Sequence, residues 1–250
     1  MYILEINSIE LFLGCVLIFF AAVFFRYLVA AGIFYWYYFR LKNEKYKSKR
    51  LSSRAFRKDQ LKKEIYWSMW SSLIFGFFGA LLFFFWQKDW TAIYTDVNQY
   101  GLWYLPVSFI ILALIHETYY YWIHRAMHHP KIFRKVHKVH HDSLVPSPWT
   151  AFSFHPWESL LEALIVPAIL LLLPVHIFVL LGYLIFMTLS SVINHLDIEV
   201  YPKAFINSPF GKWFIGATHH HYHHAEFKTN YGLYFTFWDR WMKTESKSTL

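Results

Sequence analysis

The chain has 250 residues, of which 56% are hydrophobic, 22% aromatic and only 16% charged. Soluble domains carry roughly 25% charged residues, so this deficit favours a protein for which a lipid bilayer is part of the solvent. The single cysteine, Cys15, excludes a disulfide framework and a cysteine-based zinc or iron–sulfur site. The length suits one domain, and we expect residues 1–250 to form a single membrane domain.

The net charge of +8 is concentrated in one segment. Residues 40–63 hold eleven of the 24 Lys and Arg residues: Arg40, Lys42, Lys45, Lys47, Lys49, Arg50, Arg54, Arg57, Lys58, Lys62 and Lys63. This segment joins two apolar runs, where basic residues mark the cytoplasmic side of a membrane protein. We attribute the charge to membrane topology rather than to nucleic acid, and a docking surface for an acidic partner is compatible with that role.

The first apolar run, residues 9–39, exceeds the roughly 20 residues that one span needs, and Arg26 interrupts it. We expect one long or tilted helix in which Arg26 snorkels or faces other helices. Two shorter pieces, with the second lying in the membrane interface, are the alternative. Residues 1–5 lack the basic start of a signal peptide, so we expect no cleaved leader.

Two further spans are predicted near residues 66–86 and 102–123. Residues 87–100, between them, are polar and poor in Lys and Arg, which suits the side opposite the basic segment. The third span then returns the chain to the cytoplasmic side just before His124.

A second long apolar tract covers residues 159–193 and is divided by Pro167 and Pro174. A helical hairpin that enters and leaves on one side fits best, because it brings His155 and His195 to the same face. Between the third expected span and this second tract, residues 131–142 are typical of a charged surface helix that ends before Pro146 and Pro148.

We therefore expect an all-α integral membrane bundle, with about four spans or span-like hairpin arms plus a long first helix. A cytosolic, histidine-rich helical cap would consist of residues 124–158 and 195–250.

Histidines carry the functional signal. Thirteen of the fifteen lie between His116 and His155 or between His219 and His224. Within these stretches three groups repeat a spacing of three or four: His124 and His128; His137, His140 and His141; His220, His223 and His224. Residues so spaced share one helix face, and neutral imidazole binds iron, copper, nickel and zinc. A tetrahedral zinc site is complete with four ligands. The eight histidines of these three groups exceed that number and therefore predict a two-metal centre at the membrane border.

For the other histidines the sequence leaves the role open. His155 and His195 are candidate ligands at the two ends of the hairpin, and His129 could replace His128. We expect His219 and His221 to be spare, His116 to be an interior histidine or a donor behind the ligands, and His176 to lie on the far side.

Ligating histidines usually donate their other N–H group to a carboxylate or a carbonyl. The acidic residues beside the histidine motifs are Glu117, Asp142, Glu158, Glu226 and Asp239. The chain has no Gly-x-Gly-x-x-Gly fingerprint, P-loop, Gly-x-Ser-x-Gly elbow or His-Glu-x-x-His motif. A nicotinamide or flavin site therefore has no support.

The ordered motifs resemble the fatty acid hydroxylase/sterol desaturase superfamily, and within it the sterol C5-desaturases, or lathosterol oxidases. They are His124-Arg125-x2-His128-His129, Val136-His137-Lys138-Val139-His140-His141, Phe154-His155-Pro156, His220-x2-His223-His224-x5-Asn230-Tyr231-Gly232 and Trp238-Asp239-Arg240. The resemblance covers residues 112–244. Lys243 stands where the family often has glycine before Thr244, and a fused cytochrome b5 domain is absent from the sequence.

This resemblance implies an integral membrane enzyme with two Fe ions and O2 as co-substrate. Its implied ligands are His124, His128, His137, His140, His141, His220, His223 and His224, with His155 and His195 as further candidates. Its electrons would come from an external donor of the cytochrome b5 or ferredoxin type.

The expected activity is sterol C5-desaturase-like desaturation of a membrane lipid, with hydroxylation of a lipid as the alternative. A membrane metal transporter is the rival from another class. The expected location is the endoplasmic reticulum or a bacterial inner membrane, with the cap on the cytosolic side.

Overall fold

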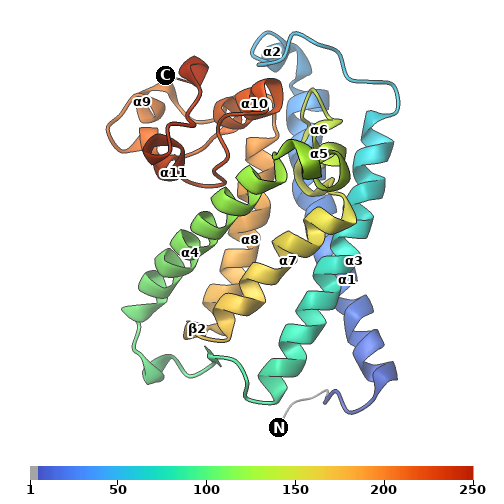
Figure 1. Ribbon diagram of the computed structural model, residues 1–250, viewed down its shortest axis with the longest axis vertical. Coiled ribbons are helices and arrows are strands. Elements are labelled where there is room, and N and C mark those ends of the chain that lie inside the picture. Colours follow the sequence, from blue (N-terminus) through green and yellow to red (C-terminus); the bar gives the residue numbers. More distant parts are fainter. Residues whose placement is uncertain (1–4, 250) are drawn as a thin grey trace.

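The computed structural model describes residues 5–249, so the predicted absence of a leader concerns residues that lie largely outside it. Five long helices stand side by side, and the C-terminal part of the chain covers one end of them (Figure 1). They are α1 (Ile9–Tyr35), α3 (Gln60–Gln87), α4 (Tyr104–Met127), α7 (Pro156–Leu170) and α8 (Ile177–Asn194). The expected all-α membrane bundle is confirmed.

Three of the described helices are long and apolar enough to cross a membrane. They are α1 with the π-helical turn Trp36–Leu41 that continues it, α3 and α8. The segment expected as a third span corresponds to α4, which is not among these three. At about 1.5 Å per residue, the 15 residues of α7 extend about 22 Å, short of a hydrocarbon core of about 30 Å.

Helices α1 and α3 form the most extensive helix pair in the bundle. They approach most closely at Gly76, where a Cβ atom would lie only 2.6 Å from the backbone nitrogen of Phe20. At Gly79 a Cβ atom would lie 3.1 Å from the ring of Phe19. Small residues let membrane helices pack backbone to backbone, so these glycines fix the distance between α1 and α3.

Helices α7 and α8 form a hairpin that turns at the end of the bundle opposite the C-terminal part (Figure 1). Near the turn, β1 (Ile93–Tyr94) pairs in parallel with β2 (Val175–His176). A 3-10 turn, Val97–Gln99, lies in the same connection as β1. The hairpin thus starts and finishes at one end of the bundle, which we call the histidine end.

The basic segment, including α2 (Asn43–Lys47), also lies at the histidine end (Figure 1). The backbone nitrogen of Leu51 donates to the carbonyl oxygen of Asp197 over 2.9 Å, and that of Ser52 donates to the Asp197 carboxylate. Asp197 follows His195 closely along the chain. The basic segment and the cap are therefore in direct contact.

The cap is built from short helices and turns. The segment expected as one surface helix is divided at His137 into α5 (Pro130–Val136) and α6 (Lys138–His141). The remaining elements are the 3-10 turns Pro148–Phe152, Gly211–Trp213 and Lys247–Thr249 and the helices α9 (Lys203–Ile206), α10 (Ala217–Glu226) and α11 (Phe237–Trp241).

A buried carboxylate joins α3 to the loop that follows α6. Glu64 is 1% exposed and accepts hydrogen bonds from the hydroxyl groups of Ser143, Ser147 and Thr150, over 2.7 to 2.8 Å. The amide of Gln60 donates to the same carboxylate. Burying any of these donors without an acceptor would cost free energy, so their hydrogen bonds to Glu64 hold the loop against the bundle.

Candidate metal centre

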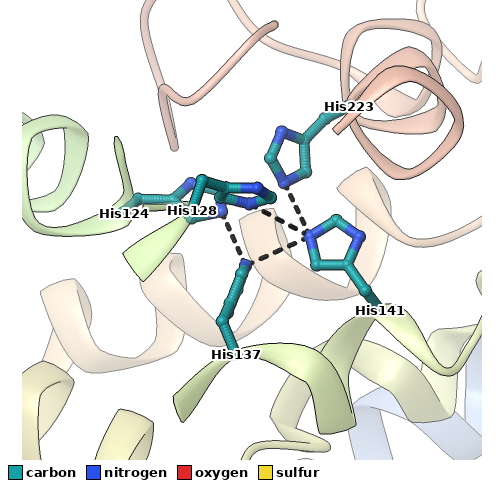
Figure 2. A group of neighbouring side chains, drawn as sticks. All are labelled: His124, His128, His137, His141 and His223. Carbon is teal, nitrogen blue, oxygen red and sulfur yellow. Dashed lines mark hydrogen bonds between the residues drawn. The ribbon is translucent and has the colours of Figure 1, made fainter. Parts of the chain in front are cut away.

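Five histidines from three parts of the chain form the first group (Figure 2). His124 and His128 come from the end of α4, His137 and His141 from the α5–α6 region, and His223 from α10. Their rings face one another, and four of the five are buried. We call this set group one.

The contacts within group one all join Nε2 atoms. His141 Nε2 lies 3.1 Å from His137 Nε2, 3.1 Å from His223 Nε2 and 3.2 Å from His128 Nε2. His124 Nε2 lies 3.0 Å from His137 Nε2. Five ring nitrogens therefore converge on one small volume (Figure 2).

Four buried histidines form group two: His140, His195, His220 and His224. His195 is the residue that directly follows α8, and its Nε2 lies 2.8 Å from His220 Nε2 and 3.2 Å from His140 Nε2. His224 Nε2 lies 3.1 Å from His220 Nε2. Since His140 and His141 are adjacent, as are His223 and His224, the two groups are built side by side.

Several rings are oriented by a partner at Nδ1. His124 donates from Nδ1 to the carbonyl oxygen of Tyr231, and His223 to that of Thr229, both over 2.8 Å. His195 donates to the carbonyl oxygen of Ser191 over 2.7 Å. A carbonyl only accepts, so the proton of each neutral ring is on Nδ1, and Nε2 presents a lone pair to the group.

His137 is oriented in the same way by a carboxylate. Its Nδ1 lies 2.7 Å from Glu158 Oε1, with both side chains almost fully buried. His124 and His137 thus point two lone pairs at each other across 3.0 Å. Two acceptors at that distance repel each other, and a cation between them removes the repulsion. The donor set therefore fits metal ions.

The spacing also indicates the kind of coordination. Two nitrogens bound to one ion at about 2.1 Å and at right angles lie about 3.0 Å apart, whereas a tetrahedron separates them by about 3.4 Å. The closest contacts, at 2.8 to 3.2 Å, match the right-angled arrangement, and all ligand atoms within each group lie within 4.8 Å of one another. Five ligands in group one also exceed the four of a tetrahedral zinc site.

The electrostatics favour the metal-binding form of the rings. Burial, with smaller contributions from neighbouring imidazoles, lowers the pKa of His137, His140 and His141 well below its ordinary value. Burial also lowers the pKa of His195 and His223 to about 4. These rings are neutral at pH 7, and only neutral imidazole ligates a metal.

The structure places the other candidate histidines outside both groups. His155 caps the start of α7, where its Nδ1 accepts from the Trp157 backbone nitrogen. His129 is exposed and caps α5 in the same way. His116 contacts the Tyr183 hydroxyl over 2.8 Å, deeper in the bundle.

The remaining histidines also make contacts elsewhere. His219 and His221 face Glu245 and Asp197, and His176 contacts the Thr95 carbonyl oxygen at the far end.

Of the five acidic residues that flank the motifs, Glu158 contacts a histidine of the two groups. Asp142 pairs with Lys138, and Glu226 accepts from Thr229 and Ser246. Glu117 and Asp239 act on the backbone instead. Glu117 accepts from the nitrogens of Leu233 and Tyr234, and Asp239 from those of Tyr231 and Gly232. These two carboxylates hold the segment whose Tyr231 carbonyl orients His124, a role that sequence reasoning missed.

A partly open cavity of about 430 Å³ lies among the helices of the bundle and reaches group two. Apolar and aromatic side chains of α1, α3, α7 and α8 form most of its wall, and His195 lines its histidine end. The cavity extends to Trp86, near the last residue of α3, and to Ile177, the first residue of α8. Both residues lie at the end of the bundle opposite the histidine end. The cavity therefore leads from the candidate metal centre into the membrane part of the protein.

A helical membrane bundle with two histidine groups at one end defines a class of membrane proteins with a candidate two-metal centre. The chain belongs to the fatty acid hydroxylase family, whose model matches residues 109–244, more than half of its length. The resemblance inferred from the histidine motifs is confirmed.

Curated relatives extend the similarity to sterol enzymes. The chain is 30% identical to a Delta(7)-sterol 5(6)-desaturase of Gibberella zeae over 87% of this chain and 64% of the relative. It is 30% identical to the lathosterol oxidase of Homo sapiens over 74% of this chain and 61% of the relative. It is 36% identical to methylsterol monooxygenase 1 of Danio rerio over 54% and 45%. The chain thus spans about three fifths of the length of the first two. No solved structure matches it significantly.

Proposed function

We propose that the protein is an O2-dependent membrane oxidoreductase that holds two iron ions and oxidises a C–H bond of a sterol-type lipid. One observation carries the proposal: nine buried or half-buried histidines present Nε2 atoms as two adjacent groups beside a cavity within the membrane helices. The names of the sterol relatives support this substrate class.

Group one would hold one iron through His124, His128, His137, His141 and His223, and group two the other through His140, His195, His220 and His224. Bound iron would supply O2 activation and hydrogen removal from carbon. Group one would thus offer five nitrogens to its ion and group two four.

The chain's own residues would bind the ions, orient the ligand rings and shield the site from water. The carbonyl oxygens of Tyr231, Thr229 and Ser191 and the carboxylate of Glu158 fix the rings before any ligand arrives. The apolar wall of the cavity excludes water and guides a lipid towards His195. Fixed rings and a dry site reduce the reorganisation that the reaction requires.

Two overall reactions are compatible with this arrangement. Desaturation converts CH–CH, O2, two electrons and two protons into C=C and two waters. Hydroxylation converts C–H, O2, two electrons and two protons into C–OH and one water. Similarity to the Delta(7)-sterol desaturase and to lathosterol oxidase favours desaturation. Similarity to a methylsterol monooxygenase supports hydroxylation as the second candidate.

Both reactions need two electrons, which an external donor of the cytochrome b5 or ferredoxin type would deliver. We propose that the cap faces the cytosol, in the endoplasmic reticulum or a bacterial inner membrane, because the basic segment lies at the histidine end. The positive charges of the basic segment would also favour binding of an acidic electron donor.

Metal transport is less well supported. A transport path would place metal-binding groups near the membrane midplane. Within the part of the chain that the structure describes, both candidate metal groups lie at the histidine end.

The test is lipid analysis of cells with and without the chain, by mass spectrometry, under air and under nitrogen. We expect a lipid product two mass units lighter, or one oxygen heavier, that requires air and is lost in His137→Ala and His223→Ala. His129→Ala is the matched control, because His129 lies outside both groups. Unchanged lipids, or a product that persists in both group-one variants, would contradict the proposal.

A further inference from the structure

Arg26 is a charged residue in the middle of a membrane helix, and its side chain lines the cavity that reaches group two. A guanidinium group in such surroundings is costly, and it usually marks a ligand or a partner. Its Nε atom is buried without a hydrogen-bond partner. Of the two positions expected for it, the structure thus favours the one facing other helices.

Glu162 of α7 lines the same cavity, and its Oε1 atom is also buried without a hydrogen-bond partner. It follows Glu158 by four residues, so it lies about 6 Å further along α7 from the carboxylate that orients His137. Among the described residues, no ion pair joins Arg26 to Glu162. The cavity therefore contains an unmatched donor and an unmatched acceptor.

The cavity wall changes from polar to apolar along its length. On α1, which runs towards the histidine end (Figure 1), the lining residues in chain order are Phe19, Val23 and Arg26. On α8 they run from Ile177 through apolar residues to Thr188, Ser191 and His195. On α7, Glu162 precedes Ala163, Val166 and Pro167, and on α4 the lining residues His116 and Tyr120 lie just before His124. On α1, α7 and α8 the polar lining residues therefore lie nearer the histidine end than the apolar lining residues do.

We propose that the histidine end of this cavity binds the hydroxyl group of a lipid alcohol, with Arg26 donating a hydrogen bond to its oxygen and Glu162 accepting one from its O–H group. The inference rests on the proposed function and deepens it: the lipid enters with its hydroxyl group towards group two and its hydrocarbon towards Trp86 and Ile177. The oxidised carbon then lies close to the hydroxyl group rather than in a distant tail.

An alcohol suits both charged residues better than a carboxylate does. A hydroxyl group both accepts and donates a hydrogen bond, whereas an ionised carboxylate only accepts. A fatty acid carboxylate would satisfy Arg26, but it has no O–H group to donate to the unpaired Oε1 atom of Glu162. Sterols and straight-chain alcohols share this chemistry, and the test separates them.

The experiment measures binding of radiolabelled probes to the purified, metal-loaded protein, without O2 or reductant. The probes are cholesterol and its 3-methyl ether, octadecanol and its methyl ether, and oleic acid. We expect cholesterol or octadecanol to bind at least about tenfold more tightly than its ether and than oleic acid, because the ether leaves an acceptor unpaired. The better alcohol identifies the source. Equal binding of alcohol and ether, no alcohol binding, or tighter binding of oleic acid would overturn the inference.

Variants locate the discrimination. Arg26→Met and Glu162→Leu should each reduce the alcohol-to-ether ratio to about threefold or less, with metal content unchanged as a check on folding. Phe83→Leu, in the apolar part of the wall, should weaken alcohol and ether equally. A ratio that stays near tenfold in both charge variants would overturn the assignment. Missing metal or missing lipid product would instead refute the proposed function, which this binding assay does not measure.

Discussion

His124 and His223 are 99 residues apart in the chain, yet their ring centroids lie only 4.4 Å apart. Each ring is fixed by a backbone carbonyl, that of Tyr231 for His124 and that of Thr229 for His223. Both carbonyls belong to the segment after α10, which Glu117 and Asp239 hold. Group one thus depends on contacts between α4 and the C-terminal part of the chain.

The contact between His137 and Glu158 predicts a loss of metal affinity when the carboxylate is removed. Partners of this kind typically contribute 10- to 100-fold to metal affinity. Glu158→Ala should weaken binding by about that factor in a chelator competition, while Glu44→Ala, at an exposed position outside both groups, should not. Equal affinities in the two variants would contradict this role for Glu158.

The different positions of His155 and His195 predict different metal contents. His195→Ala removes a member of group two and should lower metal content, whereas His155→Ala removes a residue outside both groups. Elemental analysis of the two purified variants is the measurement. Metal loss in His155→Ala alone would show that the ligand sets are wrong.

The buried carboxylate of Glu64 predicts a large effect on stability. Glu64→Ala would leave three hydroxyl groups and an amide without their acceptor, at a cost of about 2 to 4 kcal/mol in the free energy of unfolding. Denaturant titration in detergent measures the loss. Glu44→Ala, at an exposed position, is the control and should change little. A similar stability for both variants would refute the role of Glu64.

The close approach at Gly76 predicts that a single methyl group is destabilising there. Gly76→Ala would place Cβ against the Phe20 backbone and force α1 away from α3, so the melting temperature should fall. Gly14→Ala is the matched control, because no atom lies within 4 Å of its new Cβ, and alanine in a helix is otherwise favourable. Equal melting temperatures would mean that α1 and α3 pack differently.

The basic segment predicts a salt-dependent electron-transfer step. Replacing Lys45, Lys47 and Lys49 by Ala should slow turnover with a protein donor at low salt and spare turnover with a small chemical reductant. The rate ratio at low and high ionic strength is the measurement. Equal rates with the protein donor would leave these lysines a topological role alone.

Local patterns in the sequence predicted the helical segments and the histidine motifs. Spacings of three and four place side chains on one helix face wherever the helix lies, so the pattern carries its own geometry. The expected third span differs from a simple span, because His116 and Glu117 make α4 more polar. His155 resembled a ligand by its motif, yet it caps α7.

The sequence did not predict interactions between distant residues. Glu64 lies 79 residues from Ser143, and Glu117 lies 116 residues from Leu233. No local spacing pairs them, and each carboxylate resembles an ordinary helix residue. Arg26 was recognised as unusual, but the cavity that it lines is formed by helices from five parts of the chain. Such roles follow from the tertiary fold alone.

The most direct test of the account is the metal content of the protein purified without O2 and reconstituted with ferrous iron, measured by elemental analysis and Mössbauer spectroscopy. The account predicts two iron ions per chain in nitrogen-rich sites, with one lost in His195→Ala and one lost in His223→Ala. At most one iron per chain in the wild type, or two irons retained in both variants, would contradict it.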